Sequence, residues 1–139
     1  MPFRRYKTNT SGAAAVEFAL IAPLFFLTLL SLVAYGIYFS AAHSVQQLAA
    51  DAARTAVAGL NETERETLVA DFVSRSTMNH ALIDKSRLSL QVQADPSNPN
   101  QFTVQLSYDA SNLPIFNLFT YAMPEKQIRR FATVRVGGI

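Results

Sequence analysis

The 139-residue sequence contains no cysteine, and this absence excludes several kinds of protein. A chain without cysteine has no disulfide scaffold, no thiolate zinc site and no cysteine nucleophile. The two histidines, His43 and His80, lie far apart in the sequence, so we do not expect a histidine metal site. The sequence also lacks a G-x-S-x-G elbow and a phosphate-binding glycine loop, and we therefore expect neither a cofactor nor an enzymatic activity.

Charged residues are also scarce, at 16% of the chain, compared with about 25% in an ordinary soluble domain. The net charge of +2 includes a short basic leader that contains Arg4, Arg5 and Lys7. Glu17 is the only charged residue between Thr8 and Ala50, and the rest of the chain carries equal numbers of basic and acidic groups. No basic face is available to neutralise phosphates, so we expect no nucleic-acid partner.

The apolar residues gather in the segment Phe18–Phe39, which contains no charge. As a helix this segment would span about 33 Å, which matches the roughly 30 Å hydrocarbon core of a bilayer. Because the basic leader precedes it, the positive-inside rule predicts a cytoplasmic N-terminus and an extracytoplasmic remainder. A cleavable secretory signal is the main rival, since Ser40-Ala41-Ala42 resembles its cleavage site. The apolar part of such a signal is shorter, at about 7–15 residues.

Helical periodicity continues beyond the apolar segment, which predicts one long helix from Ala13 to about Ala58 with Gly59 as its C-cap. Its second half is amphipathic, with an apolar stripe of Val45, Leu48, Ala49, Ala52, Ala56 and Leu60. Asn61 and Glu64 have the spacing of a capping box and predict a second helix from Glu62 to about Thr77. The expected buried stripe of that helix is Leu68, Val69, Phe72 and Val73.

After Met78 the apolar residues alternate with polar ones, which is typical of half-buried strands. The runs 88–93 and 102–108 flank a stretch rich in turn-forming residues, so we expect a hairpin, and Gln127–Val136 predicts a third strand. Between them, the apolar segment Leu113–Met123 is expected to be a flap over the sheet or a partner surface.

The sequence therefore predicts an α+β fold. We expect a basic leader at 1–12, a long N-terminal helix at 13–60 that spans the membrane at about 18–39, and an extracytoplasmic head at 61–139. The head would contain the second helix and an antiparallel meander of about three strands. Because a head of this size buries only a modest core, we expect it to pack against the protruding half of the long helix.

The residues at the membrane entry carry a resemblance to a known family. The basic leader ends at Ser11-Gly12, and the chain then reads Ala13-Ala14-Ala15-Val16-Glu17-Phe18 before the apolar segment. This arrangement resembles the class III signal of type IV pilin-like proteins. The run from Gly12 to Pro23, GAAAVEFALIAP, is similar to that of the TadE-like pseudopilins of the tight-adherence (Tad/Flp, type IVc) pilus system.

The resemblance implies a pilin-like protein of the bacterial inner membrane that prepilin peptidase cleaves between Gly12 and Ala13. It implies a minor pseudopilin that helps to assemble an adhesive pilus, with other pilins, pseudopilins and the inner-membrane assembly platform as partners, besides the lipid bilayer. A major Flp pilin is shorter and has tyrosine after its glutamate, whereas Phe18 follows Glu17 here and a head is present. The major-subunit role is therefore disfavoured.

Glu17 poses a physical problem that the resemblance helps to explain. A carboxylate costs about 2.5–3.5 kcal/mol at the centre of a membrane helix and less near the interface, so it should be paired or remain at headgroup level. After cleavage, the new ammonium of Ala13 would lie four residues away, and a neighbouring helix could present its own ammonium. We expect such pairing at Glu17, beside Phe18, to fix the register of assembly, while the alternative is a simple interfacial charge.

Two other functions remain open. One is a single-pass envelope sensor or binding module anchored by the apolar helix, and the weaker one is a small secreted domain released near Ala42. The position of cleavage separates the three, because the sensor would keep its N-terminus and the pseudopilin would begin at Ala13.

Overall fold

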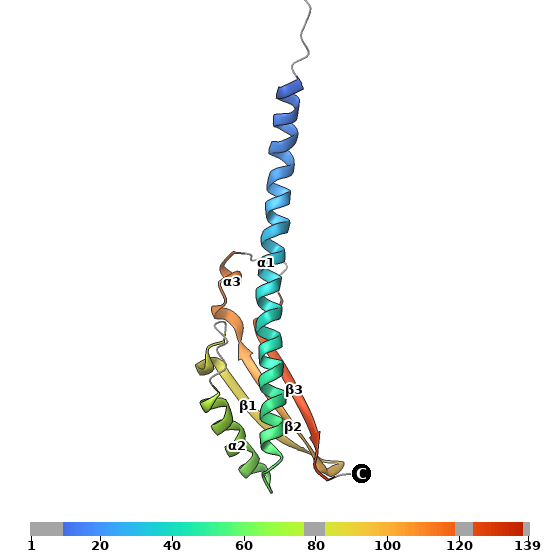
Figure 1. Ribbon diagram of the computed structural model, residues 1–139, viewed down its shortest axis with the longest axis vertical. Coiled ribbons are helices and arrows are strands. Elements are labelled where there is room, and N and C mark those ends of the chain that lie inside the picture. Colours follow the sequence, from blue (N-terminus) through green and yellow to red (C-terminus); the bar gives the residue numbers. More distant parts are fainter. Residues whose placement is uncertain (1–9, 77–82, 119–123, 138–139) are drawn as a thin grey trace, which may run out of the picture. The chain divides into compact units, whose positions relative to one another are not determined.

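The computed structural model describes residues 10–76, 83–118 and 124–137 (Figure 1). The chain divides into two compact units, Met1–Gly36 and Ile37–Ile139, each of which is considered by itself. Its elements are a long N-terminal helix, a second helix, short helical turns and three strands, which confirms the predicted α+β fold. Arg4, Arg5, Lys7 and His80 lie outside the described residues.

Helix α1 runs from Thr10 to Ala56 without interruption, close to the predicted bounds of Ala13 and Ala58. Pro23 lies inside it. In water an internal proline costs a helix about 3 kcal/mol, because it removes one backbone hydrogen bond and crowds the preceding turn. The helix nevertheless continues through Pro23. This is expected for a segment in a bilayer, because unpaired backbone N–H and C=O groups are costly in lipid.

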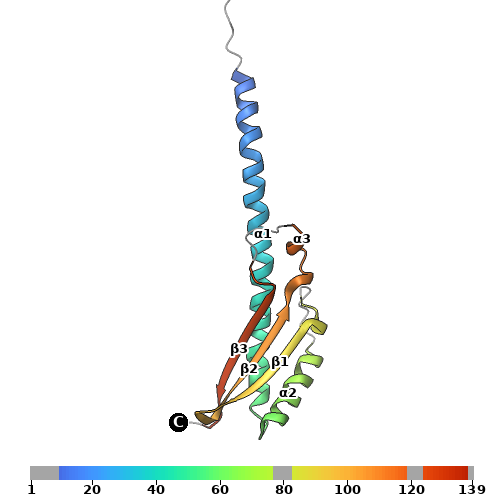
Figure 2. The same ribbon diagram turned by 180° about the vertical axis from the view of Figure 1, so that it is seen from behind.

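In the second unit, the C-terminal part of α1 lies across one face of the sheet, as both views show (Figures 1 and 2). Its buried face is made of Val45, Leu48 and six alanines: Ala41, Ala42, Ala49, Ala52, Ala53 and Ala56. The prediction that Leu60 belongs to this stripe is wrong: α1 ends at Ala56, and Leu60 is 88% exposed in the turn that follows.

The sheet has the order β1-β2-β3, in which β1 is Leu88–Asp95, β2 is Asn98–Asp109 and β3 is Gln127–Arg135. Both pairings are antiparallel, with Leu90 opposite Leu106 and Leu106 opposite Arg130. The meander and its alternation agree with the sequence prediction. One face of the central strand β2 forms part of the core. Four side chains on this face are fully buried: Phe102, Val104, Leu106 and Tyr108.

Helix α2, Glu62–Arg75, begins with the predicted cap. The Asn61 side-chain oxygen accepts a hydrogen bond from the backbone N–H of Glu64 at 2.9 Å. The Glu64 carboxylate in turn accepts one from the backbone N–H of Leu60, also at 2.9 Å. Val69 and Val73 are buried, as predicted, whereas Leu68 and Phe72 are only partly covered.

Three Asp-x-Ser sequences lie before β1, at the end of β1 and at the end of β2. Each aspartate accepts hydrogen bonds from the hydroxyl or backbone N–H of the serine two residues later, and the pairs are Asp84/Ser86, Asp95/Ser97 and Asp109/Ser111. These hydrogen bonds lower the pKa of each carboxyl, the largest contribution coming from the serine side chain. They favour turns at these positions and so define where β1 and β2 begin and end.

The apolar segment that begins at Leu113 is described as far as Leu118. Leu113 and Ile115 are buried, and the short helix α3, Ile115–Leu118, follows the 3-10 turn Ala110–Asn112. The described part therefore packs into the head, which favours the flap interpretation over a partner surface. The remainder of the predicted flap, up to Met123, lies outside the described residues.

Gly59 is required for a reason other than the predicted C-cap geometry. Its backbone does not adopt the left-handed conformation of a capping glycine, since the positive-φ glycine in the described chain is Gly137. Instead, a Cβ at Gly59 would lie 2.9 Å from the backbone nitrogen of Arg65, and the Gly59 carbonyl accepts a hydrogen bond from Arg65 Nε at 3.1 Å. The Arg65 guanidinium also lies 4.5 Å from the centre of the buried Phe102 ring. Gly59 thus permits the close approach of α2 to the end of α1.

We predict that Gly59→Ala lowers the free energy of unfolding by about 1–2 kcal/mol, because the added methyl group overpacks against backbone that cannot move freely. The matched control is Gly36→Ala, since a Cβ at Gly36 meets nothing within 4 Å. Thermal unfolding of the detergent-solubilised chain measures both variants. Equal melting temperatures for Gly59→Ala and Gly36→Ala would contradict the packing role of Gly59.

Candidate assembly and membrane segment

The four residues to which the sequence assigns processing and assembly lie close together on α1. Gly12, Ala13, Glu17 and Phe18 are all exposed in the N-terminal part of this helix, and Phe18 is 72% exposed. Ala13 and Glu17 are four residues apart, so they occupy the same face, about 6 Å apart along the axis. The helix therefore presents the predicted cleavage position and the lone carboxylate as one continuous surface.

The Gly12–Ala13 bond lies within the first four residues of α1, where the backbone N–H groups have no partner inside the helix. Few hydrogen bonds need to break for this part of the helix to unwind. A Cβ built on Gly12 would meet no described atom within 4 Å. The packing of the described chain therefore does not require glycine at this position.

Glu17 forms no hydrogen bond or ion pair with any residue in the described part of the chain. Its neighbours on the helix surface are apolar and exposed, and they include Val16, Leu20 and Ile21. A carboxylate surrounded by such side chains is costly in hydrocarbon unless a positive group approaches it. Such a group would have to come from outside the described residues of this chain.

The apolar residues that follow Glu17 are exposed around the whole circumference of α1. The large ones extend from Phe18 through Val33: Phe18, Leu20, Ile21, Leu24, Phe25, Phe26, Leu27, Leu29, Leu30, Leu32 and Val33. The span at Gly12–Ala56 contains a window of mean hydropathy 2.3, none of which is buried within the described structure, so the helix is long and apolar enough to cross a membrane. A soluble protein seldom exposes so large an apolar surface. This helix fits a single-pass membrane anchor.

The polar side chains inside the apolar segment are satisfied within the helix itself. Thr28 Oγ1 donates to the Leu24 carbonyl at 2.9 Å, and Ser31 Oγ donates to the Leu27 carbonyl at 2.7 Å. A hydroxyl without a partner costs free energy in hydrocarbon, and these bonds to the preceding turn remove that cost. Glu17 is therefore the one uncompensated polar side chain among the described residues from Gly12 to Ser31.

In the described parts of the chain, no group of three or more His, Asp or Glu side chains is placed to hold a metal ion. His43 lies exposed on α1, and its Nε2 is 3.1 Å from Gln47 Nε2. Arg130 lines a cavity with residues of α1 and was not among the predicted site residues. The alternation of β3 could have identified it, because this charged residue occupies a position where the pattern places inward apolar side chains.

Comparison with known protein families supports the resemblance that begins at Gly12. Residues 12–54 match the family model described as TadE-like protein. No curated protein and no solved structure matches the chain. The matched residues contain Gly12, Glu17 and the apolar segment and end within α1, before α2 and the sheet. Residues 12–54 of this chain are therefore similar to TadE-like proteins, which confirms the resemblance drawn from the residues at the membrane entry.

Proposed function

We propose that the protein is a minor pseudopilin that acts as a structural component in the assembly of a Tad/Flp-type pilus. The observation that carries this proposal concerns one TadE-like helix. It bears both an apolar surface that nothing in the described structure covers and a carboxylate, Glu17, that has no partner among the described residues. An anchor alone requires the apolar surface but gains nothing from Glu17. A subunit that must align with its neighbours requires both.

The proposal includes the topology expected from the sequence. The leader at 1–12 remains in the cytoplasm because Arg4, Arg5 and Lys7 precede the span, and the head faces the periplasm from the inner membrane. Prepilin peptidase removes the leader between Gly12 and Ala13. The partners are then this peptidase, other pilins and pseudopilins, the inner-membrane assembly platform and the bilayer itself.

Cleavage would supply the missing partner of Glu17. The new ammonium on Ala13 lies one helical turn from the carboxylate, so pairing within the chain neutralises Glu17 while the subunit waits in the membrane. In an assembly, the ammonium of a neighbouring helix can take the same place. Only one axial offset brings the two groups together, so this ion pair would fix the register between adjacent subunits. Hydrocarbon strengthens the pair because it weakens the screening of charge.

We predict that Gly12→Val leaves the precursor uncleaved in the membrane. The side chain would not disturb the described fold, because the space around Gly12 is open, so a loss of cleavage reflects recognition by the peptidase. The control is Gly36→Val, which adds the same side chain to α1 far from the bond. Intact-mass measurement of the membrane fraction gives the result. A Gly12→Val protein that still begins at Ala13 would contradict the proposed processing, and a wild-type chain that keeps its leader would favour the sensor.

For Glu17 we predict that Glu17→Ala and Glu17→Gln reduce surface pili at least several-fold, while insertion and cleavage remain intact. Both changes remove the charge that an ammonium partner requires, and Glu17→Lys should be the most severe because it places like charges together. The control Glu66→Gln makes the same charge change on the exposed face of α2. Pili are counted in a deletion strain complemented with each variant at matched protein levels. Normal piliation with both neutral variants would leave Glu17 no role in assembly.

A further inference from the structure

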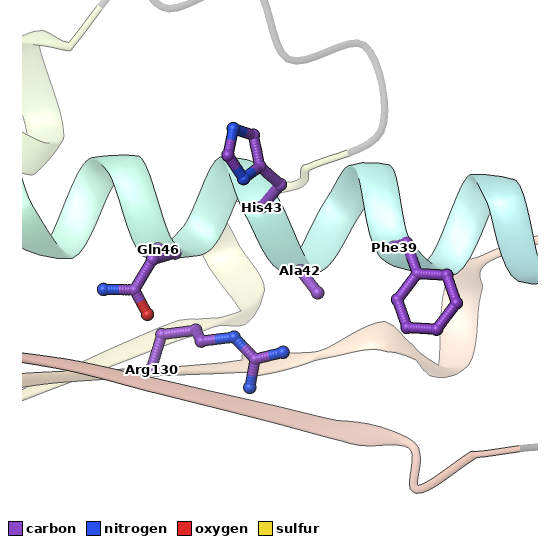
Figure 3. Close-up of a pocket in the computed structure, with 5 residues that line it drawn as sticks. All are labelled: Phe39, Ala42, His43, Gln46 and Arg130. Carbon is purple, nitrogen blue, oxygen red and sulfur yellow. The ribbon is translucent and has the colours of Figure 1, made fainter.

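A cavity of about 460 Å³ lies between α1 and β3, within the second unit of the chain (Figure 3). Phe39, Ala42, His43 and Gln46 line it from α1, and Arg130 lines it from β3. The side chains of Phe39, Ala42 and Gln46 are directed toward Arg130, whereas the ring of His43 points away from it (Figure 3). The cavity thus has an apolar wall on one side and a guanidinium on the other.

Arg130 occupies an unusual position for a charged residue. It lies in the same phase of β3 as the buried Ile128, opposite the buried Leu106 of β2, so the register directs it to the inner face of the sheet. Its neighbour Arg129 has the opposite phase and donates two hydrogen bonds to Gln127 Oε1, at 2.8 and 3.3 Å. A charged residue at an inward position reduces the apolar area of the core and therefore calls for a compensating interaction.

No carboxylate within the described residues forms an ion pair with Arg130. Its Nη1 donates to the Arg129 carbonyl at 2.8 Å, which uses one of its five N–H groups. Helix α1 carries no acidic residue between Glu17 and Asp51, so the facing helix offers no counter-charge. Gln46 donates its amide to the Phe131 carbonyl at 3.1 Å and forms an end wall of the cavity. Arg130 is therefore a half-buried residue whose guanidinium carries a positive charge that no described carboxylate neutralises.

The position of the cavity along α1 indicates which anion would meet it. The uncharged apolar run ends at Phe39, and Ala42 lies about 4.5 Å and Gln46 about 10 Å further along the helix axis. The headgroup layer extends roughly 5–7 Å beyond the hydrocarbon core on each side of a bilayer. If α1 crosses the membrane, the guanidinium opposite Ala42 therefore lies at the depth of the lipid phosphates. The adjacent Tyr38, whose hydroxyl donates to the Glu125 carbonyl at 3.4 Å, is the kind of aromatic residue found at this level.

We propose that this cavity binds the phosphate of an anionic phospholipid, with Arg130 as the recognition residue and Phe39 against the start of an acyl chain. The inference rests on the proposed role of α1 as a membrane anchor. Guanidinium groups bind phosphate oxygens with two parallel hydrogen bonds, which suits a group with several unused donors. The apolar side chains of Phe39 and Ala42 favour a lipid, because a phospholipid carries hydrocarbon in the same molecule as its anion.

The test uses the full chain reconstituted into phosphatidylcholine vesicles that contain phosphatidylglycerol as the anionic probe. The chain is extracted with its bound lipids, and mass spectrometry compares the ratio of the two bound lipids with their ratio in the vesicle. Both lipids carry a phosphate, but the choline ammonium of phosphatidylcholine is repelled by the Arg130 guanidinium, so we expect phosphatidylglycerol to be enriched on the wild type. Arg130→Gln should lower this enrichment several-fold, because it removes the charge that separates the anionic headgroup from the zwitterionic one. Arg130→Lys should keep part of the enrichment, because it keeps the charge but not the planar pair of donors.

The matched control is Arg129→Gln, which removes the same charge one residue away on the opposite face of β3. An equal loss in Arg129→Gln and Arg130→Gln, or no enrichment on the wild type, would overturn the proposal in favour of general charge attraction. Competition by free glycerol phosphate on the detergent-solubilised chain would mean that the cavity takes a soluble phosphate and not a lipid. If Arg130→Gln leaves the lipid ratio unchanged but reduces co-isolation with other pilins, the occupant is a protein carboxylate and the lipid proposal is wrong.

Resistance to alkaline extraction from the same vesicles separates this proposal from the one on which it rests. A chain that is retained in the membrane without lipid preference overturns only the assignment of the cavity. A chain that alkaline buffer removes overturns the anchor and the lipid site together.

Discussion

The structure depends on a single constraint: the first half of α1 exposes an apolar surface that no described part of the chain covers. In water such a surface would promote aggregation, whereas in a bilayer it is the favourable state. The features that look anomalous for a soluble helix then have a physical account. The helix continues through Pro23 because ending it there would leave further backbone groups unpaired, which is costly in lipid. The hydroxyls of Thr28 and Ser31 donate to carbonyls of the preceding turn. Glu17 is the exception, and an exception of this kind is most simply explained by a partner outside the described chain.

The second half of α1 contributes to the core of the head. Its face toward the sheet consists mainly of buried alanines, which provide little apolar area per residue. A small head buries only a modest core by itself, and the C-terminal part of α1 adds a buried face to it. Gly59 then allows α2 to follow directly, with Arg65 bridging the Gly59 carbonyl and the Phe102 ring. The anchor and the core of the head are thus consecutive parts of one element.

Much of this organisation could be predicted from the sequence because the dominant patterns have simple periods. The uncharged run Phe18–Phe39 identifies the anchor, and the alternation around Leu90, Leu106 and Val134 identifies the strands. Features that depend on contacts between distant residues could not be obtained in this way. The crowding of Gly59 by Arg65, and the end of α1 before Leu60, follow from how α2 folds back after the turn. The same distinction applies to the candidate sites. The spacing of Gly12, Ala13 and Glu17 can be read from the sequence, whereas only the fold brings Arg130 to the surface of α1 near Ala42.

The central claim is that one continuous helix passes from lipid into a folded head, and the absence of cysteine allows a direct measurement of it. Single cysteines are introduced as Leu24→Cys, Leu32→Cys and Arg54→Cys, all at positions exposed in the structure. Intact spheroplasts are then treated with a membrane-impermeant maleimide. The account predicts rapid labelling at position 54 and protection at positions 24 and 32, with all three labelled after denaturation in detergent. Labelling at position 24 as fast as at position 54, or labelling at position 54 only after the membrane is opened, would contradict it.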